Sequence, residues 1–226
     1  MNSRTAQIER TDVPAPATPM RARKAAKNFW KKQARIWHWI SGAVCLVGMV
    51  LFAVTGITLN HAGDIPAEPV TRSVEAQLPD EMISILATQP EEGMTGALPP
   101  EIIRQLRRDP GVNVSGRAAE WTDVDVYVGL PRPGGDGWLA IDRETGLVEY
   151  EHTSRGAISY LNDLHKGRDT GPAWALFLDV FSVATIFFCL TGLWLLQIHS
   201  AKRAITWPLT LIGVAIPVVV LVLFVH

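Results

Sequence analysis

The sequence predicts a membrane protein with three transmembrane α-helices and a small extracytoplasmic α+β domain inserted between the first two helices. Three predominantly apolar stretches occupy residues 35–61, 172–199 and 207–226, and each reaches the roughly 20 residues that a helix needs to cross a bilayer. Residues 62–171 are turn-rich and acidic, which is typical of an aqueous domain. Basic residues flank the helix ends that this topology places in the cytoplasm.

The first apolar stretch carries twenty uncharged residues from Ile40 to Leu59. At about 1.5 Å per residue, such a helix spans roughly 30 Å, the thickness of a hydrocarbon core. Trp37 and Trp39 stand at its entry, where amphipathic aromatic side chains favour the head-group region. A cleaved signal peptide is the alternative, but the apolar run exceeds the usual length of about 7–15 residues and no A-x-A cleavage site follows. We therefore expect a transmembrane helix over residues 35–61.

The residues before this helix set its orientation. Residues 1–39 contain nine Lys and Arg against two Asp and Glu, and an excess of this kind marks the cytoplasmic flank of a membrane helix. The N-terminus is thus expected in the cytoplasm. Residues 1–34 are expected to form a disordered basic tail, because their Pro/Ala-rich and Lys/Arg-rich segments offer no periodic apolar face.

The middle segment, residues 62–171, is predicted to fold as the α+β domain. Two short amphipathic stretches predict helices, and three segments of alternating apolar and polar residues predict antiparallel strands joined by tight turns. The expected helices are 79–87 and 100–108, and the expected strands are 124–128, 138–142 and 147–152.

The second membrane helix is predicted at 172–199, with Pro172 in its first turn, a position that proline favours. Basic residues follow its end, as expected for a helix that runs inward. A short cytoplasmic loop at 200–206 then leads to a third helix at 207–226, which places the C-terminus on the outer side.

Charge is segregated along the chain. Residues 1–39 carry a net charge of +7, whereas residues 61–171 hold ten Lys and Arg against nineteen Asp and Glu, a net charge of −9. This asymmetry suits an acidic extracytoplasmic domain and argues against nucleic-acid binding. No CxxC, HExxH, GxSxG or Gly-rich nucleotide loop indicates a zinc protease, a serine hydrolase or a Rossmann enzyme. Cys45 and Cys189 are expected to be packing residues and not a disulfide.

Histidine is the residue type that most suggests chemistry. Four of the six histidines stand at the ends of the first two membrane helices, where facing imidazoles would suit b-type haem, whose iron accepts axial His. The outer pair is favoured as ligands of haem iron or another metal ion. The simpler alternative is that all four are head-group or capping residues. The candidates are His61 and His165 on the outer side, and His38 and His199 on the inner side.

Asp179 is the other unusual residue, because it lies about 10 Å below the outer end of the second helix. An intramembrane carboxylate is expected to face a partner or a watery cavity, so Asp179 is a further cofactor-site candidate. The alternative is a structural hydrogen bond to Thr55 or Thr58. A Thr-Gly pair also recurs, in FAVTGITLNH and in FCLTGLWLLQIH, and the simplest interpretation is that it lets helices approach closely.

Three stretches together resemble the PepSY-associated transmembrane helix family. The resemblance covers most of residues 35–200 and follows the family's order: a membrane helix, a periplasmic PepSY-like unit, and Leu-His-x-Gly before a membrane helix with an internal Asp and Thr-Gly-Leu. The stretches are WHWISGAVCLVGMVLFAVTGITLNH, DVDVYVGLPRPGGDGWLAIDRETGLVEY and LNDLHKGRDTGPAWALFLDVFSVATIFFCLTGLWLL.

The resemblance implies a bacterial inner-membrane protein linked to iron and siderophore uptake, and some larger members of the family are haem-bearing reductases. The family's helix-end histidines fall on His38 and His165. Larger members have four or more crossings, so with three crossings a complete haem b site would need a homodimer. The leading hypothesis is periplasmic redox or metal handling with bound haem. The alternatives are a module that binds a periplasmic peptide or protein, as in peptidase regulation, and an accessory subunit of an uptake system.

Overall fold

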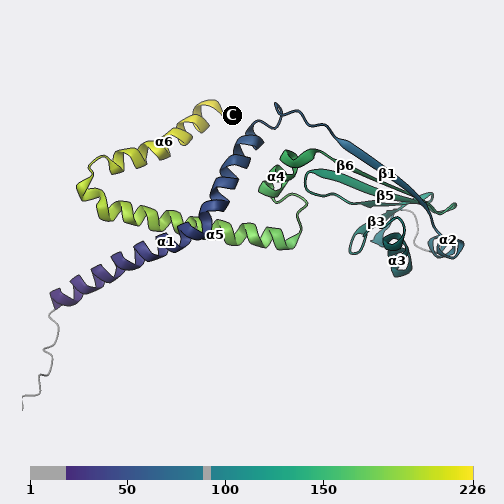
Figure 1. Ribbon diagram of the computed structural model, residues 1–226, viewed down its shortest axis with the longest axis horizontal. Helices are drawn as coiled ribbons and strands as arrows, with labels where there is room; N and C mark the ends of the chain where they lie inside the picture. Colours follow the sequence, from purple (N-terminus) through teal and green to yellow (C-terminus); the bar gives the residue numbers. More distant parts are fainter. Residues whose placement is uncertain (1–18, 89–92, 226) are drawn as a thin grey trace, which may run out of the picture. The chain divides into compact units, whose positions relative to one another are not determined.

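The computed structural model describes residues 19–88 and 93–225. The chain divides into two compact units, Met1–Cys45 with Val183–His226, and Leu46–Ser182. The elements, labelled in Figure 1, are α1 (Pro19–Asn60), β1 (Val70–Gln77), α2 (Asp80–Ala87), β2 (Thr95–Ala97), α3 (Pro100–Arg108), β3 (Ala118–Trp121), β4 (Asp125–Gly129), β5 (Gly135–Asp142), β6 (Leu147–Ser154), α4 (Gly156–Lys166), α5 (Pro172–His199), the 3₁₀ turn η1 (Ser200–Lys202) and α6 (Thr206–Phe224).

Within the part of the chain that the structure describes, three helices are long and apolar enough to cross a membrane. The apolar spans are Arg23–Asn60 in α1, Pro172–Lys202 from α5 into η1, and Thr206–Phe224 in α6. The span of α5 has none of its apolar window buried inside the protein, and neither does α6, so most of their side chains face outward. An apolar surface of this extent is stable in a bilayer and not in water, so the chain is a membrane protein.

The first helix is longer than the sequence predicted. Residues 19–34, expected in a disordered tail, form the first part of the 42-residue helix α1, whereas residues 1–18 lie outside the described residues. The segment is rich in Ala, Lys and Arg, which are strong helix formers, and it extends an existing helix without a new nucleation step. Trp30 also stacks on Trp194 of α5, with ring centroids 6.2 Å apart.

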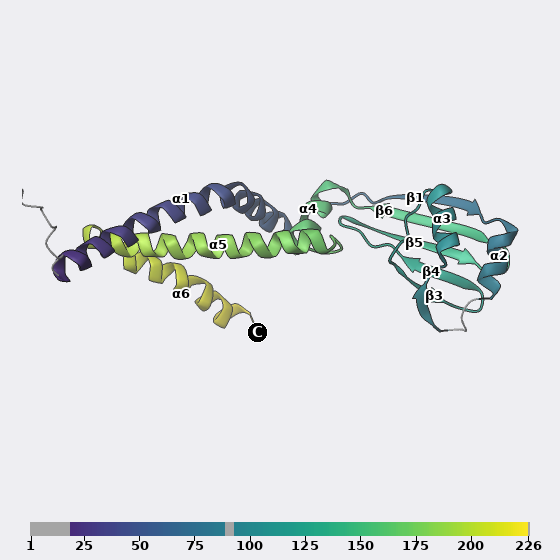
Figure 2. The ribbon, with the colours of Figure 1, turned by 90° about the horizontal axis from the view of Figure 1, so that it is seen from below.

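The second unit contains a six-stranded antiparallel sheet in the order β1-β6-β5-β4-β3-β2. Helix α3 lies against one face of this sheet, as Figures 1 and 2 both show, and α2 joins it in covering that face. The core between helices and sheet is formed by Leu86 of α2, Ile102 and Leu106 of α3, and by Val126, Val128, Leu139, Ile141 and Val148 of the strands.

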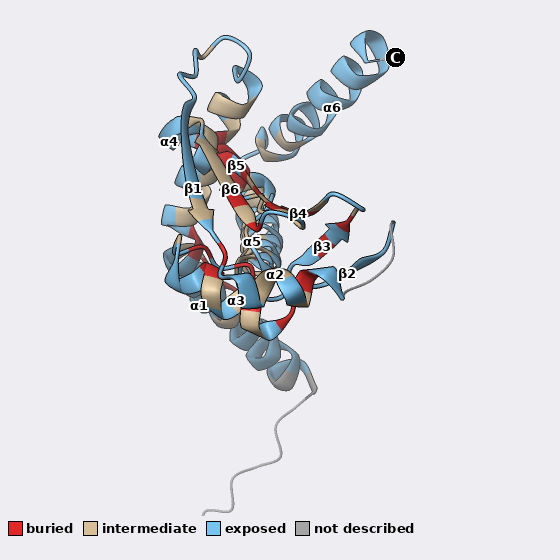
Figure 3. Cartoon of the chain, turned by 90° about the vertical axis from the view of Figure 1, so that its right-hand side faces the viewer, coloured by how far each residue is buried: buried red, intermediate tan, exposed pale blue. Residues whose placement is uncertain are grey.

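Alternating residues of the sheet point to opposite faces, as the pleat of a strand requires. In β5, Leu139 and Ile141 are buried in the core, whereas Asp136 lies exposed on the other side. Figure 3 shows the same change from buried to exposed residues along the strands. One face of the sheet is therefore covered by α2 and α3, and no described helix of the second unit covers the opposite face.

The two cysteines are free thiols, as expected, but they differ in environment. Cys45 of α1 is fully buried, which fits a packing role, whereas Cys189 of α5 is exposed.

Candidate functional site

His38 lies half-buried on α1, and α5 fixes the orientation of its ring. Its Nδ1 atom is 3.2 Å from the backbone carbonyl oxygen of Phe188 and 3.2 Å from the hydroxyl of Thr191. A carbonyl oxygen can only accept a hydrogen bond, so Nδ1 carries the proton and donates it. The other ring nitrogen, Nε2, then keeps a free lone pair, which is the form of imidazole that binds metal ions.

His199, the last residue of α5, has the same tautomer. Its Nδ1 donates to the backbone carbonyl oxygen of Leu195 at 2.8 Å, which leaves Nε2 with its lone pair. His38 and His199 line one cavity of about 580 Å³ within the first unit. Its other lining residues are Gly192, Leu195, Leu196, Lys202, Arg203 and Thr206. The structure thus brings together the inner pair of helix-end histidines.

His165 of α4 is held by α1 in the second unit. Its Nδ1 lies 2.6 Å from the Thr55 hydroxyl, which itself donates to the carbonyl oxygen of Leu51 at 2.9 Å. Because a hydroxyl has one hydrogen to give, Thr55 accepts from the imidazole, and Nε2 of His165 is again free. The His165 ring also packs on Phe52, with ring centroids 4.6 Å apart.

The repeated Thr-Gly pair holds a histidine in each unit. Thr55 bonds His165 as Thr191 bonds His38. Gly192 also leaves room for the His38 ring, because a Cβ atom added there would come within 3.1 Å of Cε1 of His38. A Cβ atom at Gly56 would lie 3.9 Å from Cε1 of His165, an ordinary van der Waals distance. The Thr-Gly repeat, which the sequence suggested was a helix-packing feature, therefore supplies the threonine that orients a histidine in each unit.

The favoured outer pair, His61 and His165, is not joined by a contact between the two rings within the described residues. His61 follows the end of α1, is exposed, and its Nδ1 lies 3.3 Å from the Asp64 carboxylate. On an ideal helix, residues 55 and 61 point about 120° apart, so His61 leaves α1 on a different side from the threonine that holds His165.

Asp179 is exposed on α5, and within the described ranges its carboxylate has no hydrogen bond or ion pair. The threonines considered as its structural partners are engaged elsewhere. Thr55 bonds His165, and Thr58 donates to the side-chain oxygen of Asn162 at 2.6 Å. The carboxylate is therefore free to meet lipid head groups, water or another protein.

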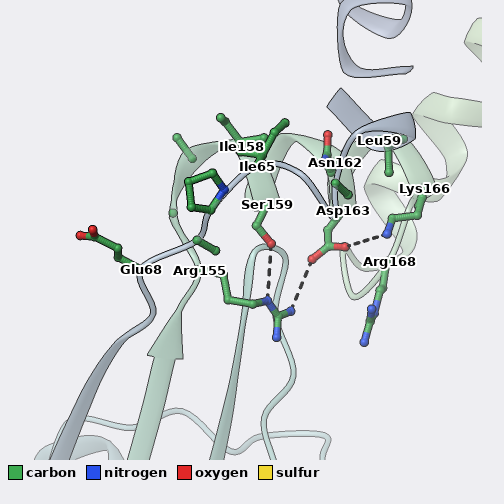
Figure 4. Close-up of a pocket in the computed structure, with 15 residues that line it drawn as sticks. Leu59, Ile65, Glu68, Arg155, Ile158, Ser159, Asn162, Asp163, Lys166 and Arg168 are labelled. Carbon is green, nitrogen blue, oxygen red and sulfur yellow. Dashed lines mark hydrogen bonds and ion pairs between the residues drawn. The ribbon is translucent and has the colours of Figure 1, made fainter. Parts of the chain in front are cut away.

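Sequence reasoning missed a buried carboxylate on α4. Asp163 accepts a hydrogen bond from the backbone N–H of Gly134 at 2.9 Å, and it faces Arg155 at 3.8 Å and Lys166 at 3.5 Å. Figure 4 shows Asp163, Arg155 and Lys166 at the wall of a cavity in the second unit, whose volume is about 560 Å³. An Asp followed three residues later by Lys on an amphipathic stretch was the only available signal, and surface helices carry many such pairs.

No group of three or more His, Cys, Asp or Glu side chains within residues 19–88 and 93–225 forms a ready metal-ion cage. His152, the one described histidine in the sheet, lies in β6 opposite Arg72. Desolvation lowers the pKa of His152, with Arg132 and Arg72 adding to this effect, so the ring is neutral near pH 7.

No curated protein and no solved structure matches the chain. A sequence family described as PepSY_TM-like matches residues 29–226. This range includes the apolar parts of the three helices, the sheet, and the threonines that bond His38 and His165. The chain therefore belongs to the PepSY_TM-like family.

Proposed function

We propose that this membrane protein binds b-type haem and acts in redox or iron handling. The observation that carries the proposal is that His38 and His199 line one cavity with their Nδ1 protons committed to backbone or threonine oxygens. Each imidazole thus leaves Nε2 available, the nitrogen that would bind the iron of a haem.

The remaining lining residues fit the same group. Leu195 and Leu196 give the cavity apolar walls, and Lys202 and Arg203 supply positive charges suited to the two carboxylates of a haem. Bound haem would supply one-electron transfer, whereas the protein's own contribution is to fix the two imidazole tautomers and neutralise the carboxylates. His165, held by Thr55, would serve a second site, with Asp179 or a second copy of the chain as the source of its remaining ligand.

The test is the absorbance spectrum of protein purified in detergent from haem-replete cells. We expect a Soret band that is lost or shifted in a His38→Ala/His199→Ala variant and retained in a His152→Ala control. A His61→Ala/His165→Ala variant tests the outer pair in the same way. A monodisperse protein without a Soret band would rule out the haem function, and a band sensitive only to the outer pair would move the site to His61 and His165.

A second candidate function is a module that binds a peptide or another protein without chemistry of its own. It is favoured by one observation, the sheet face that no described helix of the second unit covers. A pull-down that depends on residues 62–170 and survives loss of the four helix-end histidines would support it. A pull-down abolished by the histidine changes would instead favour the haem function.

A further inference from the structure

The uncovered face of the sheet, called the open face below, is made by every second residue of the strands. The strand register places Glu75, Glu149, Ala140, Tyr127 and Glu120 in one row across the sheet, on the side opposite the core residues Ile141 and Val148. These side chains are exposed or half-buried among the described residues. The open face is thus a broad surface, and no described helix of the second unit covers it.

The open face carries a strongly negative charge. None of the strand positions on this face, all of which the structure describes, holds Lys or Arg. Asp142 accepts hydrogen bonds from the backbone N–H and the hydroxyl of Thr145, which lower its pKa and keep it charged. The acidic residues of the face are Glu75, Glu120, Asp125, Asp136, Asp142, Glu149 and Glu151.

Two of these carboxylates repel each other and so destabilise the sheet when no ligand is bound. Glu75 of β1 and Glu149 of β6 lie directly opposite each other in the strand register, and like charges in that position destabilise a sheet. Neither side chain has an ion-pair partner within the described residues. A cation bound at this face would relieve the repulsion between Glu75 and Glu149. Binding of a cationic ligand would therefore also stabilise the fold.

An aromatic pair lies in the middle strands of the open face. Tyr127 of β4 and Trp138 of β5 are stacked, with ring centroids 6.3 Å apart and an angle of 20° between the ring planes. The indole N–H of Trp138 donates to Glu151 at 3.4 Å. Aromatic faces next to carboxylates attract guanidinium and ammonium groups, because the ring quadrupole and the acid act on the same cation.

The distribution of charge selects the class of ligand. The carboxylates are spread over five strands and do not converge into a metal-ion cage among the described residues. Nucleic acids and anionic lipid surfaces are repelled by a face of this sign. The complementary ligand is a chain molecule that carries several positive charges.

We propose that the open face docks a Lys/Arg-rich segment of a partner protein. Its basic side chains pair with Glu75, Glu149 and Glu120, and an Arg or Lys lies over the Tyr127–Trp138 pair. This inference deepens the binding-module function, because it names the partner's chemistry, and it is independent of haem.

The experiment measures fluorescence anisotropy of a labelled peptide of alternating Arg and Ala added to the full chain in detergent. We expect saturable binding at low salt that weakens steeply as salt is raised, and none with a Glu/Ala peptide. Glu75→Gln/Glu149→Gln should weaken binding by about 3- to 30-fold, as the loss of two exposed charge pairs implies. The matched control, Glu81→Gln/Glu101→Gln, removes two acids from α2 and α3 on the covered side and should bind as the unmodified chain does.

Thermal stability separates lost binding from misfolding. Because Glu75 and Glu149 repel each other, their double replacement should leave the melting temperature unchanged or raise it. Equal weakening by the control pair would show a general effect of acidity and overturn the proposal, as would the absence of peptide binding at low salt. The Soret band of the Glu75→Gln/Glu149→Gln variant should be unchanged, so that loss of peptide binding can be told apart from loss of haem.

Discussion

Asp163 is the only buried charged residue among residues 19–88 and 93–225, with 4% of its surface exposed. A buried carboxylate is stable only where hydrogen bonds and opposite charges replace its lost water. Here the backbone N–H of Gly134, Arg155 and Lys166 do so. The hydrogen bond from Gly134 connects α4 to the turn before β5. Asp163 thus links the helix that carries His165 to the sheet.

Replacing Asp163 with Ala should lower the stability of the second unit by roughly 1–3 kcal/mol. The buried N–H of Gly134 would lose its acceptor, whereas Arg155 and Lys166 are partly exposed and can recover water. Thermal unfolding in detergent, followed by tryptophan fluorescence, measures the change. Asp136→Ala, at an exposed position of β5, is the control. Equal stability of the two variants would show that Asp163 does not hold α4.

At the level of single residues, the sequence identified the helix-end histidines but not the groups that orient them. His38, His165 and His199 all take part in specific hydrogen bonds, and their positions at helix ends made them candidates. Their partners are a threonine or a backbone carbonyl from another turn or another helix. Such pairs depend on how helices are rotated about their axes, which an isolated sequence does not specify. The Thr-Gly repeat contained this information, but helix packing explained it equally well.

At the scale of elements, the contact between α1 and α5 in the second unit depends on a glycine. A Cβ atom added at Gly48 would lie 2.8 Å from Cζ of Phe181 and closer still to Cε2. Phe181 in turn stacks on Phe52, one turn along α1, with ring centroids 5.1 Å apart. The aromatic ring therefore occupies the space that the missing side chain of Gly48 provides.

Gly48→Ala should destabilise this helix contact by about 1–3 kcal/mol, the usual cost of overpacking a close contact. The melting temperature in detergent should fall, and Phe181→Leu introduced with Gly48→Ala should restore part of the loss by making room. Gly213→Ala in α6 is the matched control, because no atom lies within 4 Å of its added Cβ. If Gly48→Ala and Gly213→Ala melt alike, α1 and α5 do not pack through Gly48 in the membrane.

The elements that the sequence predicted are those whose pattern is local. The expected helices at 100–108 and 172–199 have the observed bounds, and the expected strands overlap β4, β5 and β6. The missed strand β1 is exposed along nearly its whole length, so its sequence shows no clean alternation, and it is held by pairing with the distant β6. β2 has three residues, too few for a periodic signal. These elements depend on long-range pairing that residue patterns do not report.

At the scale of the whole molecule, a formal net charge of −1 conceals two opposite regions. The basic residues concentrate in the first 39 residues, and the acidic excess lies in residues 61–171, including the open face of the sheet. A membrane between these regions would keep them in separate compartments, so the basic head would not compete for the open face. The proposed partner segment must then be found on the same side of the membrane as the sheet.

The topology can be tested with a reporter enzyme that is active only in the periplasm. Because Lys and Arg gather before α1 and again at Lys202 and Arg203, both regions are expected in the cytoplasm. Fusions after residue 120 and after His226 should therefore be active, and a fusion after Arg203 should be inactive. A reporter active only in the cytoplasm should give the opposite pattern at the same three positions, which controls for unstable fusions. Periplasmic activity after Arg203 would contradict the arrangement of three crossings, and it would place Lys202 and Arg203, with the cavity of His38 and His199, on the outer side.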